Sequence, residues 1–288
     1  MIKMQNSLLR LLFAALTCGI TASLATGFFE NRGQVGIPEN KYYGYPLVWR
    51  ITSLDGSTEY AATNFALNFG FWFVISFLVL LFLWKFLFPK LGISTSYKTF
   101  LLSASLFIPL GVVMDFVHEF GHALWGTIMG GTITYMQIAY FQIFPQIAIT
   151  PHFVLGLTMI EGLTYGSPAY GVMLLGGSMT TNIVSWIIAL ILLKTSFGNK
   201  KQAALKILGL LGMADLPFYV IFPQIGLSHW IFLGGNTPEP LIGARIMGVL
   251  DVVFYIFIAA STFGLILLYF KSLREKVLAE LKAIKKLD

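Results

Sequence analysis

The hydrophobic positions of the chain fall into long runs that are separated by shorter polar segments. A membrane-spanning helix needs about 20 predominantly apolar residues. Six runs have roughly this length or more: residues 7–29, 66–88, 99–128, 169–193, 203–223 and 243–270. The pattern therefore predicts an all-α polytopic membrane protein with about six transmembrane helices.

Two segments outside these runs have patterns of their own. Residues 131–149, GTITYMQIAYFQIFPQIAI, are rich in β-branched and aromatic residues. They predict two short strands near the membrane surface, as a hairpin or a re-entrant segment, with a packed aromatic loop as the alternative. Residues 271–288 place Leu273, Val277 and Leu281 at helical spacing among lysines. This spacing predicts an amphipathic helix on the inner membrane surface, or else a solvated extension of the last span.

The N-terminal part of the chain contains a candidate anchor and a polar loop. The first run follows Lys3 and Arg10 and ends near the small residues 23–25. A cleaved signal peptide is therefore one interpretation, but the run is long for a signal, which favours an uncleaved anchor. Residues 30–65 are rich in aromatic and turn residues. We expect them to form an outer loop that acts as a small cap or a lid.

Composition and charge agree with a membrane protein. Hydrophobic residues make up 57% of the 288 residues and charged residues 11%, against about 45–50% and about 25% in soluble domains. The single cysteine excludes an internal disulfide and a cysteine-rich metal site. Of the 19 lysines and arginines, 15 lie on the side that both termini share. The positive-inside rule therefore predicts a multi-pass cell-membrane protein with both termini in the cytoplasm, in contact with lipid rather than nucleic acid.

One hydrophobic run contains four ionisable residues close together. Residues 112–131, VVMDFVHEFGHALWGTIMGG, hold His118 and His122 at positions i and i+4. Both histidines then lie on one helix face and can share a metal ion. Glu119 neighbours the first histidine, where it can act as a general base on bound water. Asp115 lies on the same face and could accept the ring N–H of a ligating histidine.

This cluster has two interpretations. The four residues could be buried polar groups that hydrogen-bond to neighbouring helices. Ionisable residues inside a membrane span are costly, however, and they usually mark a functional site. The chain has only four histidines, and two of them form this pair within a span. The cluster therefore favours a metal site.

The residues that follow the cluster resemble the site-2 proteases, the family of intramembrane zinc metalloproteases. In that family a glycine and a strand-like segment follow the H-E-x-x-H helix, and further helices carry a G-P-x-x-N-like motif and an aspartate ligand. The segment LLGGSMTTNIVSWIIALILL matches Gly177 and Asn182 and has Ser178 in place of proline. The segment LGLLGMADLPFYVIFPQIG places Asp215 where the aspartate is expected. The resemblance covers about residues 99–223.

The resemblance implies one zinc ion per chain and a membrane-embedded protein as substrate. His118, His122 and Asp215 would be the ligands, and Glu119 the general base. The family's L-D-G motif is expected after the H-E-x-x-H helix, but in this chain the only L-D-G lies before it, at residues 54–56. Three other residues therefore stay open as alternatives for the third ligand: Glu239, His229 and Asp251. Glu239 could otherwise lie around the site, and Asn182 could bind the substrate backbone or hold neighbouring helices together.

The domain organisation follows from the spans and the resemblance. Residues 1–98 would form the N-terminal anchor, the outer loop and the second transmembrane helix. Residues 99–223 would form a metalloprotease-like transmembrane core. Residues 224–288 would form another outer loop, the last transmembrane helix and the amphipathic cytoplasmic tail. The charge pattern directs the metal site toward the outer face, whereas the family usually holds its site nearer the cytoplasm, so the side on which the site opens stays undecided.

Two other classes of function remain. A transporter or channel would use the ionisable residues as an ion path, but such a path predicts polar groups spread over several spans. A non-proteolytic membrane metalloenzyme is the other alternative. Di-iron hydroxylases need several histidine boxes, which four histidines cannot supply, and an intact Glu119 argues against a family member that has lost proteolysis. The sequence does not define the oligomeric state.

Overall fold

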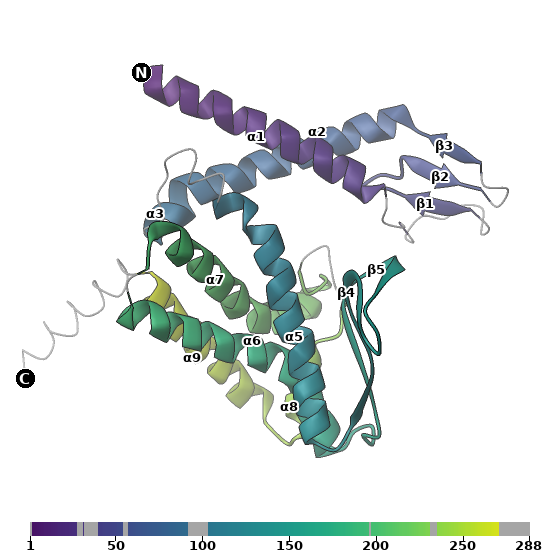
Figure 1. The fold of residues 1–288 in the computed structure, drawn as a ribbon, viewed down its shortest axis with the longest axis vertical. Coiled ribbons are helices and arrows are strands. Elements are labelled where there is room, and N and C mark those ends of the chain that lie inside the picture. The colour runs from purple at the N-terminus through teal and green to yellow at the C-terminus, as the bar shows by residue number, and fades with distance from the viewer. Residues whose placement is uncertain are drawn as a thin grey trace, which may run out of the picture. The chain divides into compact units, whose positions relative to one another are not determined.

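The computed structural model describes residues 2–27, 31, 40–53, 57–91, 103–195, 197–230 and 235–270. In these ranges the chain is mostly helical, with two small antiparallel sheets (Figure 1). The chain divides into two compact units, Met1–Pro89 and Lys90–Asp288. The amphipathic helix expected at residues 271–288 lies outside the described residues.

Six helical segments in the described part of the chain are long and apolar enough to cross a membrane. They are Leu8–Thr26, Ala62–Lys90, Ser103–Ile128, Pro168–Lys194, Asn199–Ile225 and Asp251–Tyr269. The protein is therefore a multi-pass membrane protein, as the hydrophobic runs predict.

The first unit consists of two long helices and a small sheet. Its elements are α1 (Ile2–Thr26), β1 (Lys41–Tyr43), β2 (Arg50–Thr52), β3 (Thr58–Tyr60), α2 (Ala62–Phe82), η1 (Leu83–Leu87) and α3 (Phe88–Lys90). The strands are antiparallel in the order β1-β2-β3, and they lie in the segment for which a cap or lid was expected. The side chain of Asn68 on α2 accepts a hydrogen bond from the backbone N–H of Leu47 and donates one to its carbonyl. These two bonds tie the sheet segment to the helix.

The second unit is built around one central helix. Its helices are α5 (Phe107–Ile128), α6 (Pro168–Lys194), α7 (Asn199–Ile221), η2 (Phe222–Ile225), α8 (Glu239–Ile246) and α9 (Asp251–Tyr269). Helix α6 contacts α5, α7, α8 and α9. A Cβ atom added to Gly121 of α5 would lie 2.5 Å from the carbonyl oxygen of Gly176 on α6. Small residues at such crossings let the helix backbones approach closely, which brings residues of α5 and α6 together.

The last hydrophobic run does not form one continuous helix, contrary to the predicted span at 243–270. Helix α8 ends at Ile246 and α9 begins at Asp251. Gly248 between them has a φ of 79°, which is in the left-handed region that interrupts a helix. Leu241 and Ala244 of α8 are buried with residues of α7 and α9 in one hydrophobic cluster. The short helix α8 therefore belongs to the packed interior of this unit.

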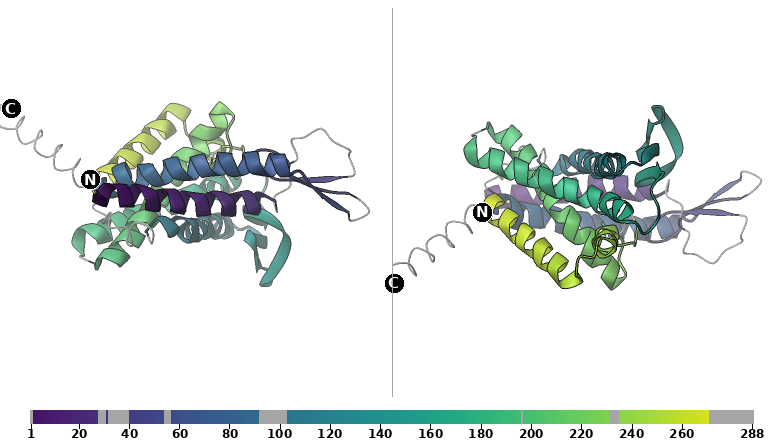
Figure 2. Two further views of the ribbon diagram at one scale, coloured as in Figure 1. Left: turned by 90° about the horizontal axis from the view of Figure 1, so that it is seen from above. Right: turned by 90° about the horizontal axis from the view of Figure 1, so that it is seen from below.

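A long β-hairpin follows α5. Strand β4 (Thr132–Phe144) pairs antiparallel with β5 (Ala148–Glu161). The prediction of strands at residues 131–149 is confirmed, but the strands are 13 and 14 residues long rather than short. The second strand lies mostly beyond residue 149, because the β-branched and aromatic pattern continues there. Both strands pack on α5, on the side away from α9 (Figures 1 and 2).

Candidate metal centre

The two histidines of the H-E-x-x-H segment are buried side by side on α5. Their i, i+4 spacing places both imidazoles on the face that packs against α6, and the Nε2 atoms lie 3.1 Å apart. His118 is 2% exposed and His122 is 6% exposed. The two side chains therefore lie together, as their spacing predicts.

The second ring nitrogen of each histidine is held by a hydrogen bond. The Nδ1 atom of His122 lies 2.8 Å from the carbonyl oxygen of Met173 on α6. A carbonyl oxygen only accepts, so this Nδ1 carries the hydrogen. The Nδ1 atom of His118 lies 2.8 Å from Oδ2 of Asp215 on α7, which also accepts a bond of 2.7 Å from the hydroxyl of Thr181. An ionised Asp215 likewise only accepts.

These bonds determine what the two Nε2 atoms can do. In a neutral imidazole with the hydrogen on Nδ1, the Nε2 atom presents a lone pair. The two Nε2 lone pairs then face one space and repel each other unless a proton or a metal ion lies between them. Two zinc–nitrogen bonds of about 2.0–2.1 Å at a tetrahedral angle would separate the nitrogens by about 3.3 Å. The observed separation of 3.1 Å is close to this value.

A carboxylate completes the group. Glu239 lies in the first turn of α8, and its Oε2 atom is 3.6 Å from Nε2 of His122. Ligand atoms of His118, His122 and Glu239 all lie within 4.8 Å of one another, and this group could hold a metal ion. Among the described residues it is the one group of three or more histidine, cysteine or acidic side chains with such geometry.

Gly177 of α6 leaves open the space that both imidazoles face. A Cβ atom at this position would lie 2.4 Å from Nε2 of His122 and 2.6 Å from Nε2 of His118. Any side chain here would therefore crowd the two nitrogen atoms that could hold an ion. The sequence identifies Gly177 only as a motif match. Its position beside the histidines depends on how α6 crosses α5, which the sequence does not show.

Glu119 lies beside the metal-binding group rather than in it. The residue is 6% exposed, and the hairpin covers it. A Cβ atom on Gly156 of β5 would lie 2.3 Å from Oε1 of Glu119, so a glycine is needed where the strand passes the carboxylate. The hydroxyl of Thr158 donates a hydrogen bond of 3.2 Å to the backbone carbonyl of Glu119. The hairpin therefore fixes the surroundings of this carboxylate.

The structure gives Asp215 a different place from the one that the resemblance implies. Asp215 was expected as the third ligand, but it bonds Nδ1 of His118, and Nδ1 and Nε2 point to different sides of an imidazole ring. In this arrangement Asp215 orients His118, while Glu239 supplies the carboxylate beside the Nε2 atoms. Asp115 was expected to accept a ring N–H, but Asp215 is the residue that makes this bond.

The remaining candidates lie outside the metal-binding group. Asn182 accepts a hydrogen bond of 2.9 Å from the hydroxyl of Ser261 on α9, so it links two helices. Asp251 forms an ion pair with Arg245, with an N···O distance of 2.6 Å. His229 is buried, and its Nε2 atom donates to the carbonyl of Thr237 at 2.7 Å. Burial lowers the pKa of His229, which favours the neutral imidazole.

Aromatic stacking connects His229 to the centre. The ring of Tyr219 on α7 lies between two imidazoles, with its centroid 4.4 Å from that of His118 and 3.7 Å from that of His229. No sequence pattern predicts this stack, because His118 is about 100 residues away from Tyr219 and His229 along the chain. Comparisons of the chain with protein-family models, curated proteins and solved structures find no match.

Proposed function

We propose that the protein is an intramembrane zinc metalloprotease, similar to the site-2 proteases. The observation that carries the proposal is the buried pair of Nε2 atoms of His118 and His122, 3.1 Å apart beside the carboxylate of Glu239. This pair lies on a helix that is apolar and long enough to span a membrane. Glu119 is adjacent to the pair and does not belong to it.

The donor set favours zinc, one ion per chain. Two imidazole nitrogens and one carboxylate oxygen are a common catalytic zinc set, which leaves a further coordination position for water or substrate. His118, His122 and Glu239 would hold the ion. Asp215 would keep His118 in the correct tautomer, as carboxylates beside ligating histidines do. Bound zinc supplies a Lewis acid that acidifies water and polarises a carbonyl group.

Glu119 would move the proton during peptide hydrolysis. Its carboxylate would accept the proton of the attacking water and pass it to the leaving amine. Burial under the hairpin excludes bulk water from this carboxylate, which strengthens its interactions with nearby charges. Thr158 and Gly156 of β5 would keep the strand in position over it.

A membrane-embedded protein is the substrate that this site suits. His118 and His122 lie in a helix that is long and apolar enough to span the bilayer, and a transmembrane helix must unwind locally before its peptide bonds can be attacked. The long hairpin on α5 would lie beside the unwound segment. The protein would be located in the cell membrane with both termini in the cytoplasm, in accordance with the charge distribution.

The proposal is tested by reconstitution. The purified protein is placed in liposomes with a panel of single-span membrane proteins, and fragments are identified by mass spectrometry. We expect cleavage that a chelator stops and that added zinc restores. A transporter would instead change ion flux and leave every protein intact. A non-proteolytic metalloenzyme would retain zinc and cleave nothing in the panel.

A further inference from the structure

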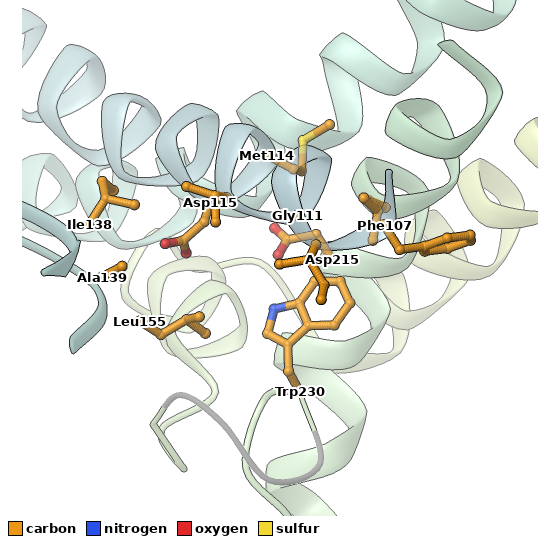
Figure 3. Close-up of a pocket in the computed structure, with 12 residues that line it drawn as sticks. Phe107, Gly111, Met114, Asp115, Ile138, Ala139, Leu155, Asp215 and Trp230 are labelled. Atoms are coloured by element: carbon orange, nitrogen blue, oxygen red, sulfur yellow. The ribbon is translucent and has the colours of Figure 1, made fainter. Parts of the chain in front are cut away.

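A cavity of about 440 Å³ lies in the second unit next to the metal centre. Its walls come from the first half of α5, from the hairpin, from α7 and from Trp230. Figure 3 shows Asp115, Asp215 and Trp230 around this space. The volume falls within the range of about 300–1,000 Å³ that is typical of ligand sites.

The cavity combines apolar walls with two carboxylates. Ile138, Leu155 and Leu211 contribute apolar wall, and the carboxylates belong to Asp115 and Asp215. Asp215 already accepts hydrogen bonds from Thr181 and His118. Since Asp215 orients His118, the cavity adjoins the metal-binding group directly.

Asp115 is the part of the cavity that the metal centre leaves unexplained. It is not a member of the metal-binding group found among the described residues. No lysine or arginine lines the cavity in the described part of the chain; Arg245 pairs with Asp251 instead, and Lys206 donates to the carbonyl of Leu91. A carboxylate against apolar walls is costly unless it has a partner. A cationic ligand in the cavity would therefore stabilise the ionised form of Asp115.

We propose that this cavity binds a lysine or arginine side chain of the substrate segment, with its charged end at Asp115. Such side chains have an apolar stem and a cationic end, which match the apolar wall and the carboxylate. The indole of Trp230 adds an aromatic face of the kind that attracts cations. An apolar side chain or a lipid chain would fill the same space but would leave Asp115 without a partner.

This inference rests on the proposed function and adds a substrate class to it. The cavity shares Asp215 with the metal centre, so a bound cationic side chain would lie close to the bond that is cleaved. The protease would then favour membrane segments that carry a lysine or arginine within a few residues of the cleavage site. A glutamate at the same position would be excluded, because like charges repel.

The charge preference of the cavity is measured with thiol reagents. Leu155→Cys places a thiol on the cavity wall, in a protein whose single natural cysteine is removed by Cys18→Ser. The probes are methanethiosulfonates with a cationic aminoethyl, a neutral hydroxyethyl or an anionic sulfonatoethyl group. We expect the cationic reagent to react at least about 10 times faster than the anionic reagent, as a charged cleft concentrates counter-ions. Asp115→Asn should lower this ratio clearly, although Asp215 remains in the wall, and the matched control Asp251→Asn should preserve it.

Protection of the same thiol tests the occupant itself. Apolar single-span peptides carry one lysine, one methionine or one glutamate near the end of the span, and they compete with the neutral reagent. The lysine peptide should protect the thiol at a concentration at least about 10-fold lower than the other two. Three results would each overturn the inference. Asp115→Asn could leave the rate ratio unchanged, all three peptides could protect the thiol equally, or none of the reagents could reach the thiol. Labelling needs neither metal nor hydrolysis, so it tests the cavity separately from the protease activity. If the protein cleaves nothing but shows the Asp115-dependent rate ratio, the proposed protease function is refuted and the cationic site is retained.

Discussion

Gly177 of α6 lies directly against His122 of α5, where an added Cβ atom would be 2.4 Å from the imidazole Nε2. The same Cβ atom would be 2.6 Å from Nε2 of His118. The two nitrogens can therefore approach α6 this closely only because position 177 has no side chain.

Gly177→Ala should remove metal binding without unfolding the protein. Alanine stabilises a helix by about 1 kcal/mol relative to glycine, so the substitution does not weaken α6 itself. Its methyl group, however, would crowd the two nitrogen atoms that could hold the ion. Metal content of the detergent-purified variant is measured by elemental analysis. Gly70→Ala is the control, because an added Cβ there meets no atom within 4 Å, and it should bind metal as the wild type does. Full occupancy in Gly177→Ala would place the ion elsewhere.

The two carboxylates near the histidines should differ in their effect on zinc affinity. Glu239→Ala removes the proposed third ligand, whereas Asp215→Ala removes a residue that orients His118, a change that typically costs about 10–100-fold in affinity. We expect the larger loss for Glu239→Ala in a competition assay with a chromogenic chelator. Asp251→Ala should change nothing, because Asp251 pairs with Arg245. The reverse order of losses would return Asp215 to the role of third ligand.

His229 should act on zinc affinity through Glu239. The carbonyl of Thr237 accepts hydrogen bonds from His229 at 2.7 Å and from the backbone N–H of Glu239 at 2.8 Å. His229→Ala frees this turn, and we expect zinc affinity to fall by about 10–100-fold. In a Glu239→Ala background the same change should have little further effect, since residues that act together are not additive. Equal losses in both backgrounds would show that His229 acts on the protein by another route.

The orientation in the membrane is tested by cysteine labelling. In a Cys18→Ser protein, Glu59→Cys in β3 should react with an impermeant thiol reagent added to intact cells. Lys200→Cys at the start of α7 should react only after the cells are opened. The reason is the excess of lysine and arginine on the side that the termini share. The opposite labelling pattern would turn the metal centre toward the other face.

The sequence predicts those parts of the molecule that depend on local pattern. The apolar runs are long enough to identify the six spans, and His118 and His122 are neighbours because one helix carries both. The strand pattern locates β4 as well. Each of these features is determined by residues within a single helix or a single strand, so the local sequence is enough to predict it.

Other parts depend on contacts between distant segments. Glu239 follows a loop and precedes a proline, so in the sequence it resembles a turn residue, and only the packing of α8 on α6 brings it to His122. Asp215 and Asp115 are both near the centre, and sequence spacing cannot distinguish which of them bonds His118. The break at Gly248 falls inside an apolar run, where hydropathy alone predicts a continuous helix.

The central claim is hydrolysis in which Glu119 moves the proton and zinc is held by other residues. Its most direct test is one experiment on Glu119→Gln in liposomes, in which zinc content and the cleavage rate of a substrate are measured on the same sample. Glutamine keeps the size of the side chain and removes the basic carboxylate. We predict that zinc remains at one ion per chain while the rate falls by about 10²–10⁴-fold or more. Glu161→Gln, an exposed carboxylate at the end of β5, should change neither quantity. Wild-type cleavage by Glu119→Gln with its zinc bound would contradict the account, and so would a loss of zinc from that variant.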